Sequence, residues 1–192
     1  LTPMPNLIIG LTGQLGSGKG YVASYIAKRY GGAIFKFSAY LSKVLGVMTL
    51  ENSRDNLVKL SESLRREFGE QVLSYALAKD AVASEAPVVV VDGIRRVDDL
   101  AALEPLPNFV LVAVEASPET RYARIMQRGE KTDEANLTRD EFQAQERRST
   151  ELTVPTVMQR ATIRIDNNGT VEELKAKIND LMNQLDFKER HS

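Results

Sequence analysis

The sequence predicts a three-layer α/β domain built on a five-stranded parallel β-sheet with helices on both faces. Five apolar runs rich in β-branched residues recur along the 192 residues, and segments of helical periodicity lie between them. The third and fourth runs are apolar almost throughout, as expected for parallel strands that are covered on both faces. Strands that alternate with helices favour right-handed crossovers and a ligand site beyond the carboxyl ends of the strands.

The elements follow from these runs in chain order. A helix is expected after the first strand, from about Val22, and the last helix is expected to begin at a capping pair of Thr170 and Glu173. The strands are expected at Leu7–Leu11, Ala33–Phe37, Val88–Val91, Phe109–Val114 and Thr162–Ile165.

Two intervals are longer than a simple crossover needs. The first, at about 38–86, carries two or three helices, among them Asn56–Phe68 and Glu70–Ser84. The second follows the helix Pro118–Gln127 and contains a helix that begins at a capping pair of Thr138 and Glu141. We therefore expect one domain, residues 1–192, with an acceptor-binding excursion at about 38–86 and a lid at about 124–150.

A phosphate-binding pattern joins the first strand to the first helix. In GLTGQLGSGKGYVA, Gly13, Gly18 and Lys19 satisfy GxxxxGK in the strand–loop–helix setting that the pattern requires. Glycines let backbone amides fold around phosphate oxygens, and the helix N-terminus and Lys19 add positive charge. The alternative is a glycine-rich turn with a surface lysine, which the extra glycines and the correct flanks argue against. The pattern predicts that the chain binds a nucleoside triphosphate or a similar molecule.

One position departs from the commonest form of this pattern. A Ser or Thr whose hydroxyl holds Mg²⁺ usually follows the lysine, and here Gly20 and then Tyr21 follow it. A phenol projects too far to replace a short hydroxyl. Mg²⁺ would then be held by the triphosphate, by water and by a carboxylate from another segment.

Asp92 is the candidate for that carboxylate. It ends the buried run of VVVVDGIRR, at the carboxyl edge of the sheet, where it resembles a Walker B aspartate that holds Mg²⁺ through water. It is also placed to accept a proton from an acceptor; the alternative is an Asp-Gly turn. Arg95 or Arg96, just beyond this edge, would face the acceptor, because a guanidinium matches a phosphate bidentately.

Further arginines lie in the two long intervals. Arg121, Arg124 and Arg128 share one helical face and would neutralise charge in a phosphoryl transfer, unless they form a solvated basic face. Arg54 and Arg65 flank an amphipathic helix and are either acceptor contacts or ordinary surface arginines.

The loop IDNNG after the last strand, with Asn167 and Gly169, is either a site for a purine ring or a simple turn.

Composition excludes several classes of function. The net charge of −1 and a pI near 6.0 argue against a nucleic-acid or anionic-membrane partner. No cysteine is present for a disulfide or a thiolate metal site, and the one histidine, His191, lies in a polar tail. No apolar run approaches the length of a membrane span and no secretory signal is visible, so a cytoplasmic protein is expected.

With these residues in view, the chain resembles P-loop kinases of the nucleoside monophosphate kinase superfamily over almost its whole length. GLTGQLGSGKG and ATIRIDNNGTVEEL resemble the opening and the final strand and loop of dephospho-CoA kinases. DGIRR and RIMQR resemble the DGxPR segment and the lid entrance of adenylate kinases. SRDNLVKLSESLRREFG, followed by VVDGIRRVDDL, is similar to phage-type deoxynucleoside monophosphate kinases, and VVVDGIR with a later strand ending in ASP resembles an archaeal family related to adenylate kinases.

The acceptor site departs from both better-known families. Dephospho-CoA kinases usually place an Asp after the second strand, and adenylate kinases a Thr and a Gly near it. This chain has FKFSAYLSK there, so Ser38 is its candidate substrate contact.

The resemblance implies an ATP-dependent phosphotransferase with Mg²⁺ that acts on a small nucleotide as a monomer or homodimer. The leading acceptor is a nucleoside or deoxynucleoside monophosphate, and the runner-up is the ribose hydroxyl of dephospho-CoA. A nucleotide-binding regulatory protein or slow ATPase is the rival from another class, favoured by Gly20 and Tyr21.

The expected catalytic residues are Lys19, Asp92, Arg95, Arg124 and Arg128, with Asp92 also holding the metal through water. The expected ATP contacts are Gly13, Leu15, Gly16, Ser17, Gly18, Lys19, Gly20, Tyr21, Asn167 and Gly169, and the expected acceptor contacts are Ser38, Arg54, Arg65, Arg95 and Arg96.

Overall fold

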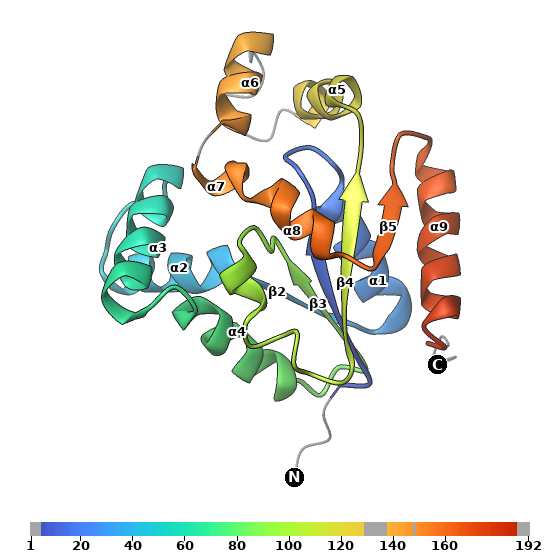
Figure 1. The fold of residues 1–192 in the computed structure, drawn as a ribbon, viewed down its shortest axis with the longest axis horizontal. Helices are drawn as coiled ribbons and strands as arrows, with labels where there is room; N and C mark the ends of the chain where they lie inside the picture. Colours follow the sequence, from blue (N-terminus) through green and yellow to red (C-terminus); the bar gives the residue numbers. More distant parts are fainter. Residues whose placement is uncertain (1–4, 129–137, 148, 188–192) are drawn as a thin grey trace.

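A parallel sheet forms the centre of the protein, seen in a computed structural model that describes residues 5–128, 138–147 and 149–187 (Figure 1). Within these residues the strand order is β2-β3-β1-β4-β5, and each neighbouring pair is parallel. The strands are β1 (Leu7–Thr12), β2 (Ala33–Lys36), β3 (Val88–Asp92), β4 (Phe109–Glu115) and β5 (Ile163–Asp166). The predicted five-stranded parallel sheet is confirmed.

Helices cover both faces of this sheet. In β1, alternate side chains belong to different cores: Ile9 packs on the side of α1 and α9, and Ile8 on the side of α2, α4 and α8. This alternation is what a strand buried on both faces requires. The helices are α1 (Lys19–Tyr30), α2 (Phe37–Val47), α3 (Arg54–Phe68), α4 (Val72–Val82), the 3₁₀ turn η1 (Val97–Leu100), α5 (Pro118–Arg128), α6 (Arg139–Glu146), α7 (Ser149–Leu152), α8 (Val154–Arg160) and α9 (Val171–Gln184).

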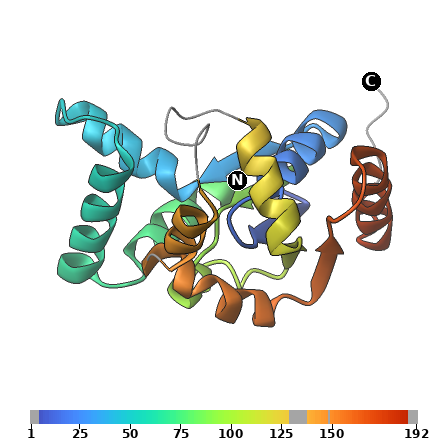
Figure 2. The ribbon, with the colours of Figure 1, turned by 90° about the horizontal axis from the view of Figure 1, so that it is seen from above.

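The two long intervals form helical additions beside the sheet. The first contains α2, α3 and α4, and α3 begins at Arg54 because the Ser53 hydroxyl accepts a hydrogen bond from the Asn56 amide. In the second, the predicted capping box of Thr138 and Glu141 starts α6. Figure 1 shows the strand arrows directed toward α5, α6 and α7, so these helices lie near the carboxyl edge of the sheet. Figure 2, the view from above, shows α2 and α3 extending to one side and α9 lying at the other.

Element boundaries differ from the predicted ones mainly at turns. The strand predicted over Ala33–Phe37 ends at Lys36, and Phe37 instead starts α2, where its ring packs into the core under α4. The helix predicted over Glu70–Ser84 spans Val72–Val82, since Gly69 ends α3 with a φ of 98° and a turn intervenes. The capping pair of Thr170 and Glu173 starts α9 as predicted.

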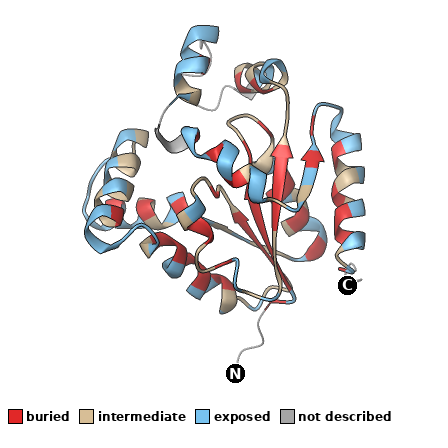
Figure 3. Ribbon diagram, viewed as in Figure 1, coloured by how far each residue is buried: buried red, intermediate tan, exposed pale blue. Residues whose placement is uncertain are grey.

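Burial follows the layers: the three central strands β3, β1 and β4 are largely buried, whereas the edge strands β2 and β5 and the outer faces of α3 and α6 are more exposed (Figure 3). Of the helices in the described part of the chain, none combines the length and the apolar character needed to span a membrane.

Candidate active site

The loop between β1 and α1 has the shape that its glycines predict. Gly13 and Gly18 have φ values of 151° and 97°, which residues with a side chain rarely adopt. A Cβ on Gly13 would lie 2.3 Å from the Val114 carbonyl oxygen, and one on Gly18 would lie 2.3 Å from Asn167 Nδ2. Both conformation and space therefore require glycine here, because β4 and the loop after β5 press against the phosphate-binding loop.

Lys19 is the first residue of α1 and folds back onto this loop. Its Nζ donates to the carbonyl oxygens of Gly13 at 2.6 Å and Gln14 at 3.0 Å. Burial is the main cause that lowers the pKa of Lys19 from 10.5 to about 8. The guanidiniums of Arg95 and Arg121 also lower this pKa, whereas Asp92 and Glu151 raise it. Side chains from distant segments thus share one electrostatic site with the loop.

Asp92 ends β3 at the carboxyl edge of the sheet, as the sequence predicts. Its side chain is 12% exposed, and its Oδ2 lies 3.5 Å from the Nζ of Lys36, which ends the neighbouring strand β2. In β1, Leu11 is its register partner, which places the carboxylate one strand away from the start of the phosphate-binding loop. A carboxylate in this position can hold a metal ion's water or accept a proton.

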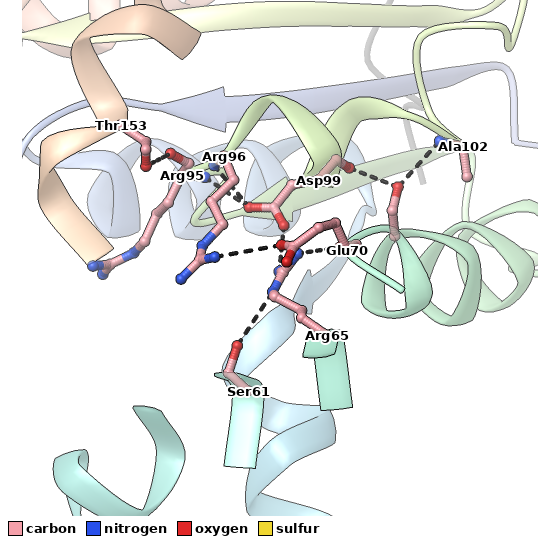
Figure 4. A network of polar contacts seen from close by, with 9 residues as sticks. Ser61, Arg65, Glu70, Arg95, Arg96, Asp99, Ala102 and Thr153 are labelled. Carbon is pink, nitrogen blue, oxygen red and sulfur yellow. Dashed lines mark hydrogen bonds and ion pairs between the residues drawn. The ribbon is translucent and has the colours of Figure 1, made fainter. Parts of the chain in front are cut away.

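Asp99, in η1, organises the chain after β3. Its Oδ2 accepts hydrogen bonds from the backbone amides of Arg95 and Arg96, each at 3.0 Å, while its Oδ1 pairs with Arg65 Nη2 at 2.6 Å (Figure 4). The side chains of Asp99 and Arg65 are each only 4% exposed. Ser74 extends the network by donating to the Asp99 carbonyl oxygen. The network thus fixes the backbone that carries Arg95 and Arg96.

Arg65 is buried in this network, whereas the sequence predicts it as a contact to the acceptor. Besides Asp99, its guanidinium donates to the Glu70 carbonyl oxygen and to the Ser61 hydroxyl. The side chain points inward because it lies on the buried face of the amphipathic helix α3. Its present contacts join α3 and the turn after it to the loop after β3.

Arg95 and Arg54 meet at a glutamate that the sequence reading missed. Glu151, in α7, is 7% exposed, and its Oε1 pairs with Arg95 Nη1 and lies 4.0 Å from Arg54 Nη2. The Thr153 hydroxyl donates to the Arg95 carbonyl oxygen at 2.7 Å, a second link between the two segments. Arg96 instead pairs with Glu70 at 3.6 Å. The only sequence signal for Glu151 was its place among the polar residues directly after the predicted lid.

The arginines of α5 approach the phosphate-binding loop from the other side. Arg121 is 2% exposed, and its Nη1 donates to the Leu15 carbonyl oxygen at 3.2 Å and to Glu146 at 2.5 Å. Arg124 Nη2 donates to Asn167 Oδ1 at 3.3 Å, while its Nη1 is buried with no partner among the described residues. The side chain of Arg128 lies outside the described part of the structure.

Asn167 joins the loop after β5 to the phosphate-binding loop. It is 4% exposed and its Nδ2 donates to the Ser17 carbonyl oxygen at 2.8 Å. The Ser17 hydroxyl is itself buried without a partner in the described residues. Gly169 lies exposed beyond Asn167, just before α9. Of the two, Asn167 is the residue that contacts both the loop and Arg124.

The remaining predicted site residues lie at the edges of this region. Leu15 packs, partly buried, against Ile125 and Phe142, and Ser38 is exposed in the first turn of α2. The Tyr21 ring stacks on Tyr25, with centroids 6.4 Å apart, on the surface of α1.

The loop fits a polyphosphate better than the surrounding carboxylates fit a metal ion. Glycine backbone, the Ser17 hydroxyl and Lys19 form a cradle of donors. Among the residues described, no group of three or more His, Cys, Asp or Glu side chains could hold a metal ion. Asp92 and Glu151 both act on the pKa of Lys19, and Asp92, at the carboxyl edge of the sheet, could hold Mg²⁺ through water. A Cβ on Gly20 would meet no atom within 4 Å, so no neighbour excludes a larger side chain.

Two open hollows in the described residues lie away from this loop. One of about 450 Å³ lies between α5 and α6, lined in part by Tyr122 and Phe142, and one of about 380 Å³ lies at the turn from α3 to α4. Neither is lined by residues of the phosphate-binding loop. The candidate site is therefore defined by its converging charges at the sheet edge.

Known proteins resemble this chain in sequence and in fold. Residues 12–143 match the model of a family described as AAA domain. The chain is 31% identical over 179 residues to a UPF0200 protein of Hyperthermus butylicus, covering 93% of this chain and 95% of that protein.

Two kinases of known structure share the fold. A shikimate kinase from Acinetobacter baumannii, in complex with shikimate, has a TM-score of 0.55 at 15% identity, over 97% of each chain. A gluconokinase from Sinorhizobium meliloti has a TM-score of 0.51 at 18% identity, over 96% of this chain and 98% of its own. These neighbours confirm the predicted P-loop kinase fold.

The buried Arg65–Asp99 pair yields a stability prediction. Asp99→Asn keeps the size of the side chain but leaves the Arg65 charge buried without its counter-ion, so the free energy of unfolding should fall by about 3 kcal/mol. Urea denaturation measures this loss. The control is Glu104→Gln, which makes a similar change in the exposed pair with Arg160 and should leave the midpoint almost unchanged. Equal midpoints for the two variants would contradict the role given to Asp99.

The lowered pKa of Lys19 yields a pH prediction. Bound phosphates favour the charged lysine and raise its pKa from about 8, so binding of ATP at about pH 9 should take up a proton. Affinity should accordingly fall as the pH rises above about 8. Calorimetry in two buffers of different ionisation enthalpy measures the uptake, and Lys19→Arg, which keeps its charge, should show none. Equal uptake by both proteins would assign the proton to another group.

Proposed function

The chain belongs to the AAA-domain family and to the UPF0200 proteins, and from its P-loop kinase fold we propose that it is an ATP-dependent phosphotransferase with a small nucleotide acceptor. The observation that carries the proposal is the shared field at Lys19. Arg95 and Arg121 lower the pKa of this lysine, while Asp92 and Glu151 raise it, so four charged side chains act on one ammonium group. Charged side chains gathered around a phosphate-binding loop suit the transfer of a phosphoryl group between two anionic molecules.

The donor side would be formed by the loop and α5. The backbone amides from Gly13 to Lys19 and the Lys19 ammonium would hold the β- and γ-phosphates of ATP. Nη1 of Arg124 is buried and has no acceptor among the residues that the structure describes, and a phosphate oxygen would provide one. Arg128 would contact phosphate as Arg124 does, a proposal that rests on its helical spacing from Arg121 and Arg124. Asn167 would support the loop next to the purine. Arg121 would hold the loop through the Leu15 carbonyl oxygen.

Asp92 would hold Mg²⁺ through water. The ion, when bound, supplies neutralisation of charge on the phosphates. Asp92 is also within the field of Lys19 and is the carboxylate that would accept a proton from a hydroxyl acceptor.

The acceptor side would use Arg54, Arg95 and Arg96, with Ser38 at its edge. Arg54 and Arg95 come from different elements and approach the same Glu151 oxygen, so they also lie within reach of a single anion. This arrangement favours a nucleoside or deoxynucleoside monophosphate, whose phosphate accepts bidentate contacts. The alternative acceptor, the ribose hydroxyl of dephospho-CoA, would rely on Asp92 as base.

The leading test is an acceptor panel. The protein is incubated with ATP and Mg²⁺ against all common nucleoside and deoxynucleoside monophosphates, dephospho-CoA and a control without acceptor, and ADP release is followed. We expect release that depends on a monophosphate, reduced by about 10²–10³ in Lys19→Ala, because one preorganised charge is lost. Activity with dephospho-CoA alone would select the alternative acceptor. Equal release in the control would instead identify an ATPase.

Gly20 gives a second prediction, on metal use. Since no neighbour obstructs a side chain there, Gly20→Ser should add the hydroxyl ligand that the commonest form of the motif provides. The ratio of ATP affinities with and without Mg²⁺ should rise about tenfold, as expected for about 1.4 kcal/mol. Gly20→Ala is the control, since it makes the same change to the helix backbone without a hydroxyl. An equal ratio in Ser and Ala variants would mean that the metal lies away from this position.

A further inference from the structure

Glu151 is a buried acidic residue to which the proposed function assigns no role. Its carboxylate is 6% exposed, whereas the side chains of Arg95 and Arg54 are 39% and 32% exposed. The glutamate therefore lies behind the two arginines, and the arginines present their remaining surface to solvent. The flanking residues Leu152 and Thr153 are exposed, so Glu151 is the buried contact of this short stretch of chain.

One carboxylate oxygen serves both arginines. Oε1 of Glu151 pairs with Arg95 Nη1 and lies 4.0 Å from Arg54 Nη2. Two guanidiniums this close repel each other, and the negative charge between them offsets the repulsion. The Arg95 guanidinium has five N–H donors, so its contact with Glu151 leaves donors for another oxygen anion, and the Arg54 guanidinium lies beside it on the same carboxylate oxygen.

The contact joins three remote parts of the chain. Arg54 starts α3, Arg95 follows β3, and Glu151 belongs to α7, between the lid helix α6 and α8. Thr153 strengthens the join through the Arg95 carbonyl oxygen. Glu151 also acts on the pKa of Lys19, which places it within electrostatic reach of the donor loop.

The geometry points to Glu151 as a positioning residue that clamps Arg54 and Arg95 into one preformed site for a phosphate monoester. This inference rests on the proposed function and goes further by naming the group that builds the acceptor site. Without the clamp, the two arginines separate before an acceptor arrives, and the acceptor itself must bring them together. Preorganised charge removes that cost from the binding of the acceptor.

Inorganic phosphate is the probe, because it tests the site without requiring transfer. Calorimetry on the full chain measures the phosphate binding that Arg95→Gln weakens but does not abolish and that Lys19→Ala retains. Glu151→Gln, which keeps the shape but loses the charge, should weaken this binding about tenfold, and Glu151→Asp, which retains the charge on a shorter chain, should weaken it less. In the Arg95→Gln background, Glu151→Gln should add no further loss, because the glutamate acts through the arginine.

The control is again Glu104→Gln, a glutamate paired with Arg160 away from this site, which should bind phosphate normally. Tighter phosphate binding by Glu151→Gln would overturn the inference and make Glu151 a competitor of the acceptor. The inference would also be overturned by any of three results. Glu151→Gln could leave the phosphate affinity unchanged, its loss could add to the loss caused by Arg95→Gln, or phosphate binding could prove independent of Arg95. If phosphate binding depends on Glu151 but the protein transfers no phosphate, the role of Glu151 as a positioning residue stands and only the proposed function is refuted.

Discussion

The buried ion pair between Arg65 and Asp99 is the contact on which the position of α3 against the loop after β3 depends. Arg65 belongs to α3, the helix that begins with Arg54, and Asp99 accepts hydrogen bonds from the backbone amides of Arg95 and Arg96. The pair therefore fixes the distance between the helix and the loop that carry the arginines of the proposed acceptor site. A charged pair in a dry interior contributes little net stability, but removing one partner is costly because the other charge stays buried. The contact acts as a constraint on geometry more than as a source of stability.

The shape of the phosphate-binding loop depends mainly on close packing. β4 and the loop after β5 leave no room for side chains at Gly13 and Gly18, and Asn167 bonds directly to the Ser17 carbonyl oxygen. The phosphate-binding loop is thereby held from two sides before any ligand binds, apart from the Lys19 ammonium, which rests on loop carbonyls. A loop prepared in this way loses little conformational entropy when phosphates bind. The same crowding removes water from Lys19, which is why its pKa is lowered.

The sequence predicted the features that depend on interactions between residues close together in the chain. The strands, the phosphate-binding loop and the caps at Thr138 and Thr170 depend on residues a few positions apart, and they are found where the sequence places them. Asp99 and Glu151 could not be assigned from the sequence, because their partners lie 34 and 56 residues away and the pattern does not encode how the intervening helices pack. Arg65 has the spacing of a surface arginine; only the packing of α3 against the loop after β3 turns it inward. The sheet edge could be predicted, but not the pairing of charges above it.

The pairing of charges links the two halves of the site through one part of the chain. Arg121 in α5 bonds to the Leu15 carbonyl oxygen in the phosphate-binding loop and to Glu146 in α6, while Glu151 in α7 pairs with Arg95. The helices near the carboxyl edge thus contribute a cation to the proposed donor side and an anion to the proposed acceptor side. A movement of α5 to α7 would change both sides together, since neither contact is made by the sheet itself. A phosphotransferase needs this dependence, because a donor site complete without its acceptor would transfer the phosphate to water.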